Sequence, residues 1–297
     1  MADLVLRPLS IGELLDRSLF IFRRRFAVLL IITLICLAIP LALSARTLAR
    51  LGNVGSLEQA ASTSAMLAGF GDLLIYSLLF FVLNSVANAA IVFVVSEAYL
   101  GRAMGAGAAL SRTLRVAAPV IVLAILQQVI LLAGAVVLIP VSLLAPAAGT
   151  VSGTSLGLAV GGFILYQAVE LFLAVSIFVS LPALVLEPDA NPIGAMGRAW
   201  RLASGNRWRI LGVLMVLGVI TFLIFIAMAV VAGVIAGAAS AGAETGTMGA
   251  ITLAVMVILW VLVFSLVYCL QTVTYYDLRV RKEGFDLELL AANMSEA

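Results

Sequence analysis

The chain has 297 residues, of which 64% are hydrophobic and only 11% are charged. A soluble domain carries about 25% charged residues, so this composition excludes an ordinary water-soluble domain. The formal net charge of +2 says little as a total, and the absence of histidine removes the most common catalytic base.

The first predicted element is an amphipathic helix at 11–22. Ser10 and Glu13 form a capping-box pair, which predicts a helix start at Ile11. Apolar residues then recur at helical spacing on one face, namely Ile11, Leu14, Leu15, Leu19 and Phe22. We expect this segment to lie in the membrane interface as an elbow helix that leads into the first membrane span.

Long apolar runs follow at 26–44, 73–98, 116–144, 156–186, 210–238 and 250–274. Each run reaches or approaches the roughly 20 residues that a helix needs to cross a hydrocarbon core of about 30 Å. A backbone without water must satisfy its polar groups internally, so we expect helices. The sequence therefore predicts an all-α, polytopic membrane protein with six transmembrane helices. A cleaved signal peptide is the competing interpretation of 1–45, but the run at 26–44 exceeds the usual length of about 7–15 residues.

The positive charges indicate the orientation of these spans. If the N-terminus is cytoplasmic, every one of the 17 lysine and arginine residues except Arg46 and Arg50 falls on the cytoplasmic side. The positive-inside rule then predicts a bacterial inner-membrane protein with both termini in the cytoplasm.

An internal repeat organises the predicted spans within a single membrane domain, 1–297. The Ile-Gly start at Ile11 recurs at Ile193, and a fainter copy follows Gly101. We interpret the chain as three units at 10–98, 101–187 and 192–275, with a cytoplasmic tail at 276–297. Each unit has a cytoplasmic amphipathic elbow helix, the third at 193–204, and then a helical hairpin. The alternative is that any cytoplasmic loop of a membrane protein is basic and amphipathic.

Polar residues within the spans are the first candidate site. Glu170 is the one ionisable residue at a predicted midplane, and Tyr166 and Gln167 project from the same side of its helix. At similar depth, other spans supply Asn84, Asn88, Gln127 and Gln128. These groups could line a ligand pocket or a proton path. The structural alternative is interhelical hydrogen bonding, which contributes about 0.6 kcal/mol per pair on average.

The tail is the second candidate site. Tyr275 and Tyr276 are typical of the interface where a span leaves the membrane. The charges beyond them have both signs, which favours salt bridges to the basic elbows over a solvated, frayed terminus. The predicted cytoplasmic docking residues are Tyr276, Asp277, Arg279, Arg281, Arg17 and Arg198.

Catalytic and metal-binding patterns are missing from the sequence. Cys36 and Cys269 lie inside predicted spans, where they are typical of small buried side chains. Glu187 and Asp189 form a near pair that we interpret as a turn before the third elbow. We therefore predict no catalytic residue, no metal site, no cofactor and no nucleic-acid partner.

Three polar segments flank the spans: Arg7-Pro-Leu-Ser-Ile-Gly-Glu-Leu-Leu-Asp-Arg, Ala199-Trp-Arg-Leu-Ala-Ser-Gly-Asn-Arg-Trp and Tyr275-Tyr-Asp-Leu-Arg-Val-Arg-Lys-Glu-Gly-Phe-Asp-Leu-Glu288. With them the chain resembles a family of bacterial membrane proteins labelled by similarity to the membrane domain of glycerophosphoryl diester phosphodiesterase. The resemblance implies a stand-alone six-span membrane protein. The phosphodiesterase chemistry belongs to a separate soluble barrel with histidines, so the resemblance implies no catalytic residue here.

These observations lead to three functional hypotheses. The first is a non-enzymatic membrane module that docks a protein partner or anionic lipid headgroups through its cytoplasmic face, where the basic residues meet the headgroups. The alternative is a transporter or lipid-handling protein that uses the polar midplane residues. An integral-membrane enzyme is the third.

Overall fold

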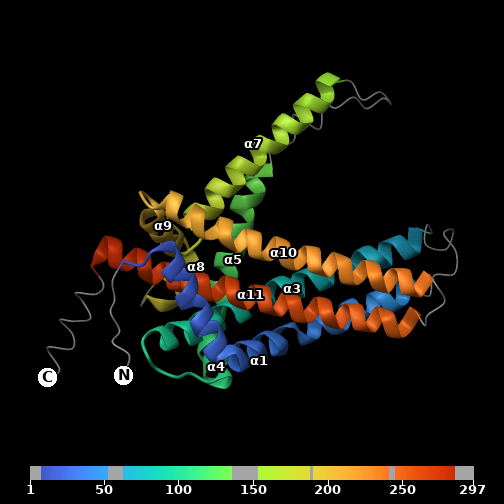
Figure 1. Ribbon diagram of the computed structural model, residues 1–297, viewed down its shortest axis with the longest axis horizontal. Helices are drawn as coiled ribbons and strands as arrows, with labels where there is room; N and C mark the ends of the chain where they lie inside the picture. The colour runs from blue at the N-terminus through green and yellow to red at the C-terminus, as the bar shows by residue number, and fades with distance from the viewer. Residues whose placement is uncertain (1–7, 53–62, 136–152, 188–189, 241–244, 285–297) are drawn as a thin grey trace. The chain divides into compact units, whose positions relative to one another are not determined.

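The computed structural model describes residues 8–52, 63–135, 153–187, 190–240 and 245–284 (Figure 1). All regular secondary structure within these ranges is helical, which confirms the all-α prediction. Residues 136–144 of the third expected span and 285–297 of the tail lie outside the described residues. The helices are α1 (Ile11–Gly52), α3 (Thr63–Tyr99), α4 (Ala106–Arg115), α5 (Ala117–Ala135), α7 (Gly153–Ile177), α8 (Ser180–Leu186), α9 (Pro192–Ala203), α10 (Arg207–Ser240) and α11 (Thr245–Glu283).

Several of these helices are long and apolar enough to cross a membrane. In the described part of the chain, the qualifying segments are Ile75–Tyr99 in α3, Val160–Leu186 in α7 and α8, Arg207–Val231 in α10, and Val261–Glu283 in α11. A fifth is added if α4 and α5 count together as one broken span. Large apolar side chains on α10 are widely exposed, such as Phe222 at 64%. Exposed apolar surface of this extent is expected of a helix whose solvent is hydrocarbon, so the protein is membrane-embedded.

The described helices belong to two compact units. Unit 1 comprises α1, α3 and α4, with α10 from Met215 and α11 as far as Val273. Unit 2 comprises α5 from Ala118, α7, α8 and α9, with α10 as far as Leu214 and α11 from Thr274. These units do not follow the three expected repeats, which stay a prediction.

The start of α1 has the predicted capping box. The backbone N–H of Ser10 donates to Glu13 Oε2 at 2.7 Å, and the N–H of Glu13 donates to Ser10 Oγ at 3.2 Å. From Ile11 the helix continues without a break to Gly52, so the expected elbow at 11–22 and span at 26–44 are parts of one helix. Figure 1 shows that the first turns of α1 run in a different direction from the rest. A separate first elbow helix is not confirmed.

In unit 1, a tight turn connects α3 to α4. Gly101 has a positive φ of 79°, and the N–H of Arg102 donates to the carbonyl oxygen of Glu97 at 2.8 Å. This is the Schellman geometry that ends a helix at a glycine. The Glu97 carboxylate also pairs with Arg102 at 2.7 Å and with Arg112 of α4 at 3.4 Å. Ion pairs of Glu97 thus hold the end of α3 against the short helix α4.

In unit 2, α9 is a separate helix close to the expected third elbow at 193–204. The Asn191 side chain accepts a hydrogen bond from the Gly194 N–H at 2.6 Å, and Pro192 occupies the first turn. The expected turn at Glu187 and Asp189 stays a prediction, because residues 188–189 lie outside the described residues. Gly205, with a φ of 82°, then turns the chain into α10.

Candidate functional site

The α9–α11 cluster is a group of charged and aromatic side chains in unit 2. It joins the end of α8, the helix α9, the start of α10 and the end of α11. Its members are Glu187, Arg198, Arg209, Tyr275, Asp277, Arg279, Arg281, Lys282 and Glu283.

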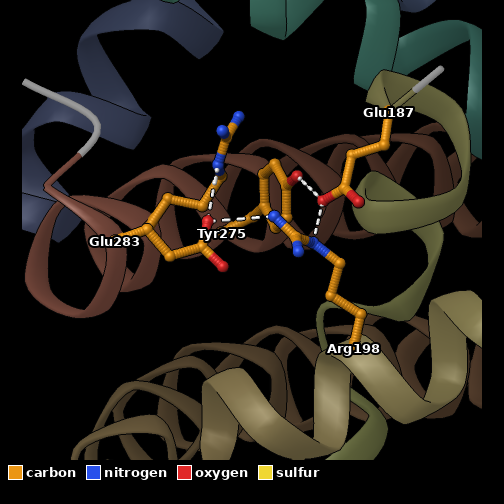
Figure 2. Close-up of polar contacts among 5 residues, drawn as sticks. Glu187, Arg198, Tyr275 and Glu283 are labelled. Carbon is orange, nitrogen blue, oxygen red and sulfur yellow. Dashed lines mark hydrogen bonds and ion pairs between the residues drawn. The ribbon is translucent and has the colours of Figure 1, made fainter. Parts of the chain in front are cut away.

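Glu187 is an acceptor that two helices share. The hydroxyl of Tyr275 donates to Glu187 Oε1 at 2.5 Å, and Arg198 Nε donates to the same oxygen (Figure 2). Tyr275 is 0% exposed, and a buried phenol needs such a partner. The ring of Tyr275 thus lies inside the protein, and its expected place at the level of the membrane interface stays a prediction.

Arg198 links Glu187 to the end of α11. Its Nη2 donates to Glu283 Oε2 at 2.9 Å, and that oxygen also accepts from Arg279 Nε at 3.1 Å (Figure 2). Partial burial lowers the pKa of the Arg198 guanidinium, but the carboxylates of Glu187 and Glu283 raise it by more, so the net shift of the pKa is upward. Arg198 is thus a permanently charged link between α9 and α11.

Asp277 is the most deeply buried acid among the described residues of the cluster. Its side chain is 0% exposed and lies between two arginines. Arg209 Nε donates to Asp277 Oδ2 at 2.9 Å, and Arg281 Nε donates to it at 3.1 Å. The Arg198–Glu283 pair thus joins the described part of the tail to α9, as predicted, and the Arg209–Asp277 pair joins it to α10.

Lys282 completes the attachment of α11 to α9. Its Nζ donates to the backbone oxygen of Arg201 at 2.6 Å and to Ser204 Oγ at 2.9 Å. These acceptors lie at the carboxyl end of α9, where unpaired carbonyl groups favour a cation. Lys282 therefore satisfies the end of α9 while it fixes the end of α11.

Arg207, at the start of α10, has a different environment. Its Nε donates to Ser176 Oγ at 3.2 Å, and its guanidinium carbon lies 4.8 Å from the Phe172 ring centroid and 4.9 Å from that of Trp200. The two rings meet edge to face with centroids 5.8 Å apart. No carboxylate of the described residues pairs with Arg207. Aromatic faces hold this cation in place but leave its charge unneutralised.

Most of the predicted docking residues have partners inside their own unit. Arg198, Asp277, Arg279 and Arg281 belong to the ion pairs described above, and Tyr276 is only 4% exposed. In unit 1, the Arg17 guanidinium lies 4.9 Å from the centroid of the Tyr99 ring. These contacts lie within the protein, and a docking role of the six residues stays a prediction.

Two of the predicted midplane residues, Asn84 and Gln127, form hydrogen bonds within their own units. In unit 1, Asn84 Nδ2 donates to the Tyr268 hydroxyl at 3.1 Å, whereas Asn88 Oδ1 is buried without a hydrogen-bond partner in the described part of the chain. In unit 2, Gln127 Nε2 donates to Ser180 Oγ at 2.7 Å.

The acid of α7, Glu170, is partly exposed and lies four residues after Tyr166 in the same helix. Gln128 and Gln167 are exposed. Both the pocket and the interhelical hydrogen-bond interpretations of these residues stay predictions.

Sequence reasoning missed two central residues of unit 2. The sequence interpretation places Glu187 only in a turn, although an acid between an apolar run and a basic helix already favours an ion pair. Arg207 is one of many basic residues in the sequence. Nothing in the sequence distinguished it, because its environment depends on Phe172 from a distant helix.

Comparison of the chain with known protein families, curated proteins and solved structures finds no match. The family resemblance carried by the flanking segments therefore stays a prediction. Among the described residues, no group of three or more histidine, cysteine, aspartate or glutamate side chains is arranged to hold a metal ion.

Proposed function

We propose that this protein is a non-enzymatic integral membrane module that docks anionic lipid headgroups at the cytoplasmic face of a bacterial inner membrane. In this proposal the chain crosses the membrane six times, with both termini in the cytoplasm. The helix α9 and the first turns of α1 and α4 lie in the cytoplasmic interface. The positive-inside distribution of arginine supports this orientation.

The unneutralised charge of Arg207 is the observation that carries the proposal. A guanidinium has a planar fork of donors that matches the oxygens of a phosphate. At Arg207, only Nε has a hydrogen-bond partner among the described residues, which is Ser176. The remaining N–H groups are available to an anionic oxygen outside the protein.

The side chains around Arg207 suit the level of lipid headgroups. Trp208 is 86% exposed and Ile193 is 75% exposed, and both lie at the starts of helices in unit 2. Trp200, which contacts Arg207, is 39% exposed. Tryptophan is enriched where a protein meets the membrane–water interface, so these residues support a lipid-facing surface.

The α9–α11 cluster supports the same proposal through rigidity. The Arg198–Glu283 ion pair and the two Lys282 hydrogen bonds fix α9 against the end of α11, and Trp200 of α9 then holds Arg207. A cation that is already held in place loses less conformational freedom when it binds an anion. The predicted role of the tail thus changes from direct docking to positioning.

Arg207→Gln is expected to lower the retention of phosphatidylglycerol about fivefold, because a cation at a lipid surface contributes about 1 kcal/mol. The retention of phosphatidylglycerol by Arg207→Lys is expected to lie between those of the wild-type protein and Arg207→Gln, because lysine keeps the charge but lacks the planar fork. The measurement is mass spectrometry of lipid bound per protein after detergent washing, with phosphatidylcholine of the same acyl chains as the reference lipid.

Arg24→Gln is the matched control, because Arg24 is an exposed cation of unit 1. It is expected to change the retention of phosphatidylglycerol by less than Arg207→Gln does. Equal losses for the two variants would reduce the proposal to nonspecific charge attraction, and no loss for Arg207→Gln would contradict it.

A further inference from the structure

Unit 1 contains an apolar groove between α1, α10 and α11. It consists of two adjoining hollows, with volumes of about 240 Å³ and about 190 Å³. Leu217, Ile220 and Leu266 line both hollows, so these residues form the place where the hollows meet. All the residues that line the groove belong to unit 1.

The groove has the length of a lipid chain within one leaflet. Along α11 it extends from Leu262 to Leu270, which is roughly 12 Å at a rise of 1.5 Å per residue. One leaflet has a hydrocarbon thickness of roughly 15 Å, half of the membrane core. The leucine and isoleucine side chains of the wall match a hydrocarbon chain, so an acyl chain fits this groove.

One end of the groove carries a single charged side chain. Gly12, Leu15, Asp16 and Leu19 of α1 line the larger hollow at spacings of three and four residues, which places them on one helix face. Asp16 is exposed, and no cation of the described residues forms an ion pair with it. A carboxylate at this end favours a positively charged headgroup and disfavours an anionic one.

We infer that the groove binds a phospholipid whose headgroup carries a primary ammonium, with the acyl chain in the groove and the ammonium on Asp16. A primary ammonium has three N–H donors for a carboxylate. A quaternary ammonium has none, and an anionic headgroup is repelled by Asp16. The preference at this groove is therefore opposite to that proposed for Arg207. The two sites depend on different residues and on different lipids.

Asp16→Asn is expected to lower the retention of phosphatidylethanolamine about threefold, to the level of phosphatidylcholine, because an exposed ion pair contributes up to about 1 kcal/mol. The purified protein is incubated with phosphatidylethanolamine, phosphatidylcholine or phosphatidylglycerol of identical chains, and bound lipid is measured by mass spectrometry. Asp16→Glu, which keeps the charge, is expected to retain phosphatidylethanolamine. Equal retention of phosphatidylethanolamine by the wild-type and Asp16→Asn proteins would overturn the inference.

Ile220→Trp tests the groove itself, because the larger side chain fills the place where the two hollows meet. It is expected to lower the retention of phosphatidylethanolamine at least as much as Asp16→Asn does. Val219→Trp is the matched control, because Val219 is 57% exposed on the same helix and does not line the groove. An equal loss for both tryptophan variants would overturn the groove as the binding site. A change of Ile220→Trp from dimer to monomer in gel filtration would instead identify a second copy as the occupant. If Ile220→Trp does not fold, the Asp16 variants still decide the headgroup preference.

Discussion

Asp277→Ala is expected to lower the free energy of unfolding by about 3 kcal/mol, because it leaves Arg209 and Arg281 without their shared acceptor. Removing one partner of a buried ion pair costs about 3–5 kcal/mol. The lower end applies here, since the side chains of Arg209 and Arg281 are 19% and 28% exposed. The measurement is unfolding of the detergent-solubilised protein by denaturant.

Two further proteins separate the ion pair from a packing effect. Glu283→Ala is the control, because its carboxylate is 27% exposed and its pairs lie nearer to solvent. It is expected to cost less than about 1 kcal/mol. The double variant Asp277→Leu with Arg209→Met is expected to recover part of the loss, because it removes two opposite charges together. Wild-type stability of Asp277→Ala would contradict the structural role of this acid.

Glu187→Ala is expected to lower the free energy of unfolding by about 2 kcal/mol, because the buried hydroxyl of Tyr275 then has no acceptor at this position. Tyr275→Phe removes the same hydrogen bond from the other side. The two losses should therefore not add, and a double-mutant cycle should give an interaction energy of about 1 kcal/mol.

Tyr166→Phe is the matched control for the aromatic substitution. Tyr166 lies in α7, and its ring is not fully buried. We expect a smaller loss of stability than for Tyr275→Phe. Full additivity of Glu187→Ala and Tyr275→Phe would show that these side chains do not act through their shared bond.

The features that sequence predicted correctly are mostly local. The Ser10–Glu13 capping box depends on residues a few positions apart, which the sequence displays directly. The mixed charges of the tail predicted salt bridges because the basic segments offered the opposite sign. The sequence could not predict which arginine pairs with which acid, since the pairing depends on how α9 and α11 pack.

The expected first elbow at 11–22 shows that a cluster of charged residues between two segments does not by itself end a helix. Arg23, Arg24 and Arg25 separate the amphipathic segment from the apolar run, but arginine is a good helix former. No glycine or proline lies between these segments, so α1 continues through them. Between α9 and α10 the sequence has Gly205, and there the helix ends.

Sidedness of α9 is the most direct test of the proposed docking face. In a protein with Cys36→Ala and Cys269→Ala, a single Ile193→Cys is treated with a membrane-impermeant thiol reagent, since Ile193 is 75% exposed. We expect labelling in inverted membrane vesicles and none in intact cells, whereas Ser152→Cys, expected on the outer side, is labelled in intact cells. Labelling of Ile193→Cys in intact cells would place α9 on the outer side and contradict a cytoplasmic docking face.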